Sequence, residues 1–134
     1  HVEEVIRPAL ARGAVVLTDR YVDSAVAYQG AGRALGVREV RDLQDWAVTG
    51  LLPDLTVVID IPAAEGRRRR GDLHDRLEAE GDGYHEAVRR IFLDLAAAQA
   101  HRYLVVDGCA ESRTIHAQIS DRLGLSRGPD DRMA

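Results

Sequence analysis

The sequence predicts an α/β fold in which helices flank a parallel sheet. Three short apolar runs, at residues 14–17, 55–61 and 103–106, are typical of buried strands. They alternate with stretches in which apolar residues recur every three to four positions, as on one face of a helix. Three strands make a narrow sheet, so we expect the sheet to be incomplete at the N-terminus, with further strands preceding residue 1.

The first two helices are predicted around the first strand. An apolar stripe over residues 2–10 stops just before Gly13, which suits the C-terminal cap of a helix. A second helix is expected over residues 22–29, closed by Gly30 and Gly32 and followed by a glycine-bounded loop.

The middle of the chain carries the strongest strand signal. Apolar periodicity predicts a helix over residues 37–52. Residues 55–61, LTVVIDI, are nearly all apolar or β-branched, as expected of a parallel strand covered on both faces. Pro62 is suited to the first position of a helix, here a short basic one over residues 63–71. The polar stretch 71–83 is expected to be a mobile loop.

The last third repeats the alternation. We expect a helix over residues 84–100, a strand over 103–106 and a final helix around 115–123. Together these elements predict one domain over residues 1–125. The polar tail at 126–134 is expected to be disordered.

Composition excludes several classes of protein. The net charge of −4 argues against binding to nucleic acid or to an anionic membrane, and no apolar run approaches the ~18 residues of a membrane span. All 18 basic residues are Arg, so a GxxxxGK[ST] phosphate loop is impossible within this chain. The single cysteine, Cys109, suits a reducing cytoplasm, with a catalytic thiol as the alternative.

Asp19 and Arg20 follow the first predicted strand, where parallel sheets bind ligands. An Asp there can hold a magnesium-bound water or accept a proton, and an Arg can grip a phosphate with its fork of N–H donors. The alternative is an ion pair that caps the strand.

Ser24 and Tyr28 are four residues apart and therefore share one face of the predicted helix. They could offer a hydroxyl to a base and a ring to a sugar, and Gln29 adds an amide. Spacing alone favours the alternative of polar residues that face water.

The Arg run at 67–70, with Arg76 beyond it, has two interpretations. It is either a solvated helix face or a lid that neutralises charge during phosphoryl transfer. Gly108 and Cys109 follow the last strand, where small residues could let a flat ring approach, unless the loop is a simple turn. The five His residues lack zinc-ligand spacing, so no metal site of protein nitrogen or sulfur is predicted.

Three motifs in this order resemble bacterial thymidylate kinases: DRYVDSAVAYQGAGR at 19–33, PDLTVVIDIP at 53–62, and an Arg-rich segment ending in DRLE at 75–78. The resemblance covers residues 1–124. It implies a fold like that of P-loop nucleoside monophosphate kinases. It also implies a cytoplasmic phosphotransferase that converts dTMP to dTDP with ATP and Mg²⁺, a step of dTTP biosynthesis, and that can form a homodimer through the helices at 2–10 and 22–29.

The resemblance also implies roles for individual residues. Asp19 would lie near the phosphates and contact Mg²⁺ through water, and Arg20 would bind the phosphate of dTMP. Ser24 would lie by the thymine and Tyr28 against the deoxyribose, with Gln29 beside it.

On the ATP side, the resemblance implies a lid whose catalytic arginines are Arg69, or its neighbour Arg70, and Arg76. Gly108 and Cys109 would border the adenine.

The departures from the family pattern leave the function open. The phosphate-binding loop is expected before residue 1, so we expect this chain to be a fragment that does not turn over substrate by itself. Ala25 stands where some members place an amide that contacts the base. The alternatives are a noncatalytic remnant or interaction domain with the same fold, and another nucleoside or nucleotide kinase.

Overall fold

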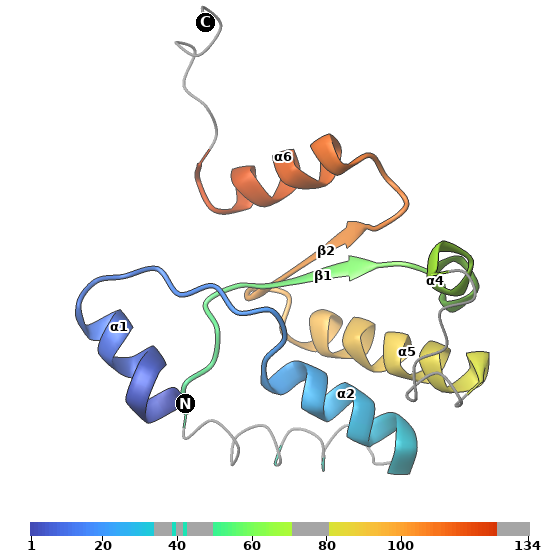
Figure 1. Cartoon of the computed structure of the whole chain (residues 1–134), viewed down its shortest axis with the longest axis horizontal. Helices are drawn as coiled ribbons and strands as arrows, with labels where there is room; N and C mark the ends of the chain where they lie inside the picture. Colours follow the sequence, from blue (N-terminus) through green and yellow to red (C-terminus); the bar gives the residue numbers. More distant parts are fainter. Residues whose placement is uncertain (34–38, 40–41, 43–49, 71–80, 126–134) are drawn as a thin grey trace, which may run out of the picture. The chain divides into compact units, whose positions relative to one another are not determined.

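The computed structural model describes residues 1–33, 39, 42, 50–70 and 81–125, and divides the chain into two compact units, His1–Leu52 and Pro53–Ala134. Each unit is described by itself, and the prediction of a single domain over 1–125 stays a prediction. The elements in chain order are η1 (Val2–Ile6), α1 (Arg7–Ala11), α2 (Val22–Arg33), β1 (Thr56–Asp60), α4 (Ala63–Arg70), α5 (Asp82–Ala98), β2 (Tyr103–Asp107) and α6 (Ser112–Arg122) (Figure 1). None of these helices is both long and apolar enough to cross a membrane.

The first helix confirms the prediction for residues 2–10, and η1 and α1 run on as one coil. It ends in a Schellman cap at Gly13, whose φ of 78° is readily adopted only by glycine. The Gly13 amide donates to the Leu10 carbonyl (2.9 Å), and the Ala14 amide donates to the Ala9 carbonyl (3.1 Å).

The predicted strand at residues 14–17 is wrong for the described structure. The segment has no secondary structure, and its side chains at Val15 and Leu17 are 96% and 95% exposed. An apolar run supplies strand propensity, but a strand forms only when its backbone groups pair with a neighbour. The described sheet accordingly contains two strands rather than three.

Helix α2 is longer than predicted. It continues through Gly30 and Gly32 to Arg33, so the expected closure at these glycines is wrong. Glycine inside a helix costs about 0.5–1 kcal/mol, which weakens a helix without ending it. Most of the predicted helix at 37–52 lies outside the described residues.

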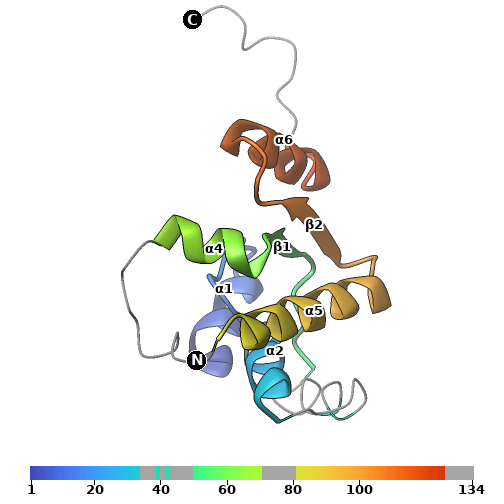
Figure 2. The same cartoon turned by 90° about the vertical axis from the view of Figure 1, so that its right-hand side faces the viewer.

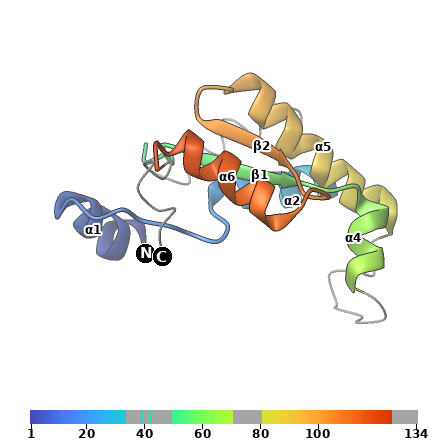
Figure 3. The same ribbon diagram turned by 90° about the horizontal axis from the view of Figure 1, so that it is seen from above.

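The second unit is organised around two parallel strands. Strands β1 and β2 pair in register from Thr56 opposite Tyr103 to Asp60 opposite Asp107, which confirms both predicted strands. Helix α5 packs on both strands and α6 packs on β2, on opposite faces of the pair (Figures 1 and 2). Helix α4 lies at the carboxyl ends of the strands, as the view from above also shows (Figure 3).

The helices of this unit confirm the predicted positions at 63–71, 84–100 and 115–123, with one change. Helix α4 begins at Ala63, so Pro62 precedes the first helical residue instead of occupying it. The Pro62 carbonyl accepts a hydrogen bond from the Gly66 amide (3.0 Å). The core comprises apolar side chains of α5 and β2, namely Val88, Leu95, Ala96, Tyr103 and Val106.

Arg102 anchors the amino ends of the strands. It is only 4% exposed, and its guanidinium lies 4.5 Å from the centroid of the Tyr103 ring. It donates to the side chains of Gln99 (2.6 Å) and Thr56 (3.2 Å). A buried charge is tolerated when it is hydrogen-bonded, and these contacts tie β1 to the turn before β2.

Gly108 crosses very close to the end of β1. A Cβ at this position would lie 2.9 Å from both the Asp60 carbonyl oxygen and Cγ2 of Ile59. The Gly108 amide donates to that same carbonyl at 2.7 Å. A side chain at this position would force the backbone of β1 or the Ile59 side chain to shift.

We expect Gly108→Ala to lower the free energy of unfolding by about 1–3 kcal/mol, because the methyl group must displace backbone. Gly83→Ala is the matched control, since Gly83 lies in α5 and a methyl group added there would have no neighbour within 4 Å. It should stabilise by up to about 1 kcal/mol. Urea denaturation followed by circular dichroism measures both, and equal stability of the two variants would contradict the packing argument.

Candidate functional site

Among the predicted site residues that the structure describes, Arg20 is the one other than glycine with a positive φ. Its φ of 64° lies in the left-handed region, which costs a non-glycine residue about 1–2 kcal/mol. Its guanidinium carbon lies 5.3 Å from the centroid of the Tyr28 ring, within the range of a cation–π contact. The structure thus brings together two residues that were predicted to share a ligand.

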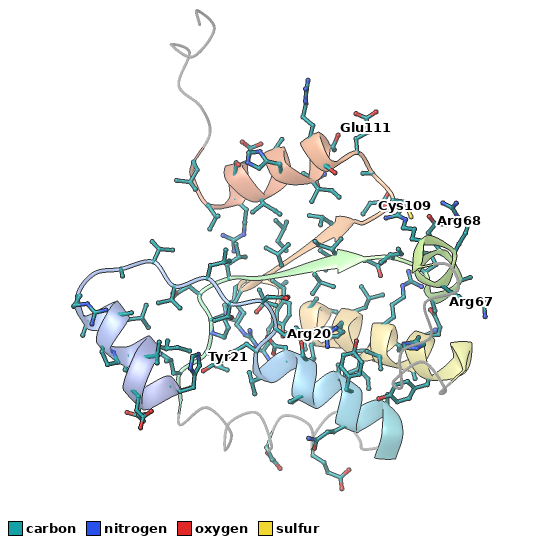
Figure 4. All side chains as sticks on the ribbon, in the orientation of Figure 1. Arg20, Tyr21, Arg67, Arg68, Cys109 and Glu111 are labelled. Atoms are coloured by element: carbon teal, nitrogen blue, oxygen red, sulfur yellow. The ribbon has the colours of Figure 1, made fainter. Side chains whose placement is uncertain are left out.

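Two hydrogen bonds fix the segment between Arg20 and Tyr28. Burial raises the pKa of the Tyr21 hydroxyl, which donates to the Leu51 carbonyl at 3.3 Å. The Ser24 amide donates to the Tyr21 carbonyl (3.1 Å), at the start of α2. Tyr21 had no predicted role, although it lies inside the same motif as Arg20; both residues are labelled in Figure 4.

Three further residues of the motif at 19–33 were singled out from the sequence together with Asp19. Ser24 and Tyr28 are both in α2 and four residues apart, so they share a helix face. Gln29 and Asp19 are exposed. Asp19 and Arg20 form no ion pair with each other in the described structure, so the alternative of a strand-capping pair finds no support there.

In the second unit, Glu65 gathers two members of the Arg run. It accepts two hydrogen bonds from Arg68 (2.7 and 2.8 Å) and one from Nε of Arg69 (2.8 Å). The bonds from Arg68 first, and then from Arg69, lower the pKa of Glu65 to about 2. The side chain of Arg68 remains 74% exposed, in keeping with a largely solvated helix face.

Arg69 reaches beyond its own helix. Its Nη1 donates to the Gly108 carbonyl at 2.9 Å, so a predicted lid arginine meets the predicted adenine loop. The Cys109 amide donates to the Asp107 carboxylate at 2.8 Å, which fixes the turn after β2. Cys109 is exposed and lies beside Arg68 (Figure 4).

An ion pair at the carboxyl end of β1 was not predicted from the sequence. Arg89 of α5 donates to both carboxylate oxygens of Asp60 (2.7 and 2.9 Å) and to Glu86 (2.7 Å). The hydrogen bonds from Arg89 lower the pKa of Asp60, and those to Asp60 and Glu86 raise the pKa of Arg89. The position of Asp60 at a strand end was a signal, but Arg89 lies 29 residues away and had none.

Two further predicted lid residues are Arg70 and Arg76. Arg70 ends α4, and Arg76 lies outside the described residues. No group of three His, Cys, Asp or Glu side chains that could hold a metal ion occurs in the described part of the chain.

Comparison with known proteins decides the family. A sequence model of thymidylate kinases matches residues 1–119. The chain belongs to the thymidylate kinase family. It is 57% identical over 125 residues to the thymidylate kinase of Clavibacter sepedonicus, covering 91% of this chain and 59% of that protein. It is 52% identical over 123 residues to that of Cutibacterium acnes, covering 92% and 60%.

The fold comparison agrees with the sequence comparison. A crystal structure of thymidylate kinase from Ehrlichia chaffeensis matches with a TM-score of 0.67 and 26% identity, over 92% of this chain and 58% of that one. The predicted kinase-like α/β fold is thereby confirmed. The chain spans about 59% of the length of the thymidylate kinase relatives it matches.

The Arg89–Asp60 pair predicts a pH dependence of stability. Because the folded-state pKa of Asp60 is lowered, its contribution is complete above the unfolded pKa of about 3.9 and is lost as the pH falls through the folded value. We expect the free energy of unfolding to fall more steeply between pH 5 and pH 2 in the parent chain than in Asp60→Asn, by an amount on the order of 1 kcal/mol. Asp94→Asn, an exposed control on α5, should follow the parent chain. Parallel curves for parent and Asp60→Asn would contradict the prediction.

The left-handed backbone of Arg20 predicts that glycine is more stable than alanine at this position, the reverse of the usual order. Both Arg20→Ala and Arg20→Gly remove the guanidinium, but only alanine retains the left-handed strain. We therefore expect Arg20→Gly to be more stable than Arg20→Ala by about 1 kcal/mol. At Arg12, whose φ is −85°, alanine should be the more stable of the two. Thermal unfolding measures all four variants, and the same order at both positions would refute strain at Arg20.

Proposed function

We propose that this chain supplies the dTMP site and part of the ATP site of a kinase that transfers the γ-phosphoryl group of ATP to dTMP, giving dTDP. The observation that carries the proposal is the contact between Arg20 and the Tyr28 ring, at 5.3 Å. Membership of the thymidylate kinase family supports the choice of substrates.

In the proposed dTMP site, three side chains would each contact a different part of the nucleotide. The Tyr28 ring holds the Arg20 guanidinium on its face, which leaves the N–H fork available to a phosphate. The same ring offers an apolar surface to the deoxyribose, where an added 2′-hydroxyl would clash or lose its water. Ser24, one helical turn earlier, would meet the base, with Gln29 at the margin of the site.

The proposed ATP-binding residues that the structure describes lie at the carboxyl ends of β1 and β2. Gly108 and Cys109 would border the adenine, with Arg69 fixed to the Gly108 carbonyl. Arg69, Arg70 and Arg76 are the proposed lid arginines, which offset charge on the transferred phosphoryl group.

Magnesium would enter with ATP. Its ligands would then be chiefly phosphate oxygens and water. Asp19, exposed beside Arg20, would contact one of the bound waters. A second copy of this chain is a further proposed partner, because Val5 and Leu10 on the first helix are 52% and 39% exposed.

Calorimetric titration with dTMP tests the acceptor site. The parent chain should bind dTMP saturably, and Arg20→Ala should weaken the affinity at least tenfold, because a charge-assisted phosphate contact is lost. Arg12→Ala, which removes another exposed arginine of the same unit, should bind as the parent does. Thymidine, which lacks the phosphate, should not distinguish the parent chain from Arg20→Ala.

Two outcomes would replace the proposal. A folded parent chain that binds no dTMP would favour the noncatalytic alternative. Tighter binding of dUMP or dCMP than of dTMP would favour another nucleotide kinase of the same fold.

A further inference from the structure

We propose that Arg89 is a positioning residue for the loop 107–110: by gripping the side chain of Asp60, it fixes the strand end against which this loop and Arg69 are set. Arg89 lies on α5, a helix that carries none of the residues that the sequence assigned to the site. Its consequence for ATP rests on the proposed function, whereas its effect on the loop does not.

The first step is the ion pair between Arg89 and Asp60. Two parallel hydrogen bonds, of 2.7 and 2.9 Å, join the guanidinium of Arg89 to both oxygens of Asp60. Glu86, one turn earlier on α5, accepts a third bond at 2.7 Å and restrains the same guanidinium. Such a two-bond fork fixes orientation as well as distance, so the last residue of β1 is held rigidly to α5.

The second step passes from Asp60 to the loop through the backbone. The Asp60 carbonyl accepts the Gly108 amide at 2.7 Å, and the absent side chain of Gly108 brings the two backbones into contact. Any movement of Asp60 is therefore transmitted directly to Gly108.

The third step passes from the loop to α4. The Gly108 carbonyl accepts Nη1 of Arg69, and Nε of Arg69 is held by Glu65. A continuous series of hydrogen bonds thus runs from α5 through the end of β1 and the loop to α4. The two predicted ATP-side features, Arg69 and Gly108, share one support.

Hydrogen exchange of backbone amides, measured by NMR without ligand, tests the positioning role. In Arg89→Gln we expect the amides of Gly108 and Cys109 to exchange at least tenfold faster, while the interior amides of the β1–β2 ladder change less than twofold. Arg90→Gln is the matched control, because Arg90 is the exposed neighbour on the same helix. Arg89→Lys, which keeps the charge but not the fork, should fall between the two.

Unchanged exchange at Gly108 in Arg89→Gln would overturn the proposal, and so would a uniform increase across the ladder, which would mean a general loss of stability. If Arg89→Gln does not fold, Asp60→Asn carries the same test, since it removes the carboxylate charge without altering size.

Titration with a non-hydrolysable ATP analogue and magnesium, and separately with dTMP, separates this inference from the proposed function. We expect Arg89→Gln to weaken the analogue about fivefold and to leave dTMP affinity unchanged, and Arg90→Gln to change neither. If the parent chain binds neither nucleotide while Gly108 still loosens in Arg89→Gln, the proposed function fails and the positioning role stands. Loosening with analogue affinity unchanged would overturn the link to ATP.

Discussion

The in-register pairing of β1 with β2 is the constraint on which the second unit depends. It ends both strands at the same level, with Asp60 beside Asp107. The next residue along β2 must then pass over the end of β1, at a distance that only Gly108 allows. Arg89 of α5 binds the Asp60 carboxylate at this strand end. The close approach of Gly108 to β1 is thus a consequence of the register, and the contact of Arg69 with the Gly108 carbonyl is built on it.

The first unit depends on a different kind of constraint. Arg20 holds a left-handed backbone that glycine would adopt at lower cost. Strain of this kind persists where the surroundings enforce it and often marks functional sites. Here the next residue, Tyr21, is held by the hydrogen bond of its hydroxyl to the Leu51 carbonyl, and α2 begins directly after it, so the backbone that follows Arg20 is fixed. The strained residue is also the one whose guanidinium faces the Tyr28 ring, so the backbone conformation and the proposed phosphate contact belong together.

Sequence patterns predicted elements whose signal is local. The strand at 55–61 was predicted from a continuous β-branched run, and α5 was predicted from its apolar period. Residues 14–17 have a similar composition, but a strand also needs a neighbour to pair with, and composition does not report one. The shared face of Ser24 and Tyr28 followed from helical spacing alone. The Arg89–Asp60 pair was beyond reach, because it joins residues far apart in sequence and depends on how α5 packs on the strands.

All basic residues of the chain other than histidine are arginines, and they serve two purposes for which a planar guanidinium is suited. Arg68 and Arg89 each use the planar fork to bind a carboxylate within the protein, and their charges are compensated there. Arg20 differs, since its described partner is an aromatic ring rather than a carboxylate. A ring orients a guanidinium without neutralising it. Among these arginines, Arg20 is therefore the one whose charge and N–H donors remain available to an incoming phosphate, which is why the proposed acceptor site centres on it.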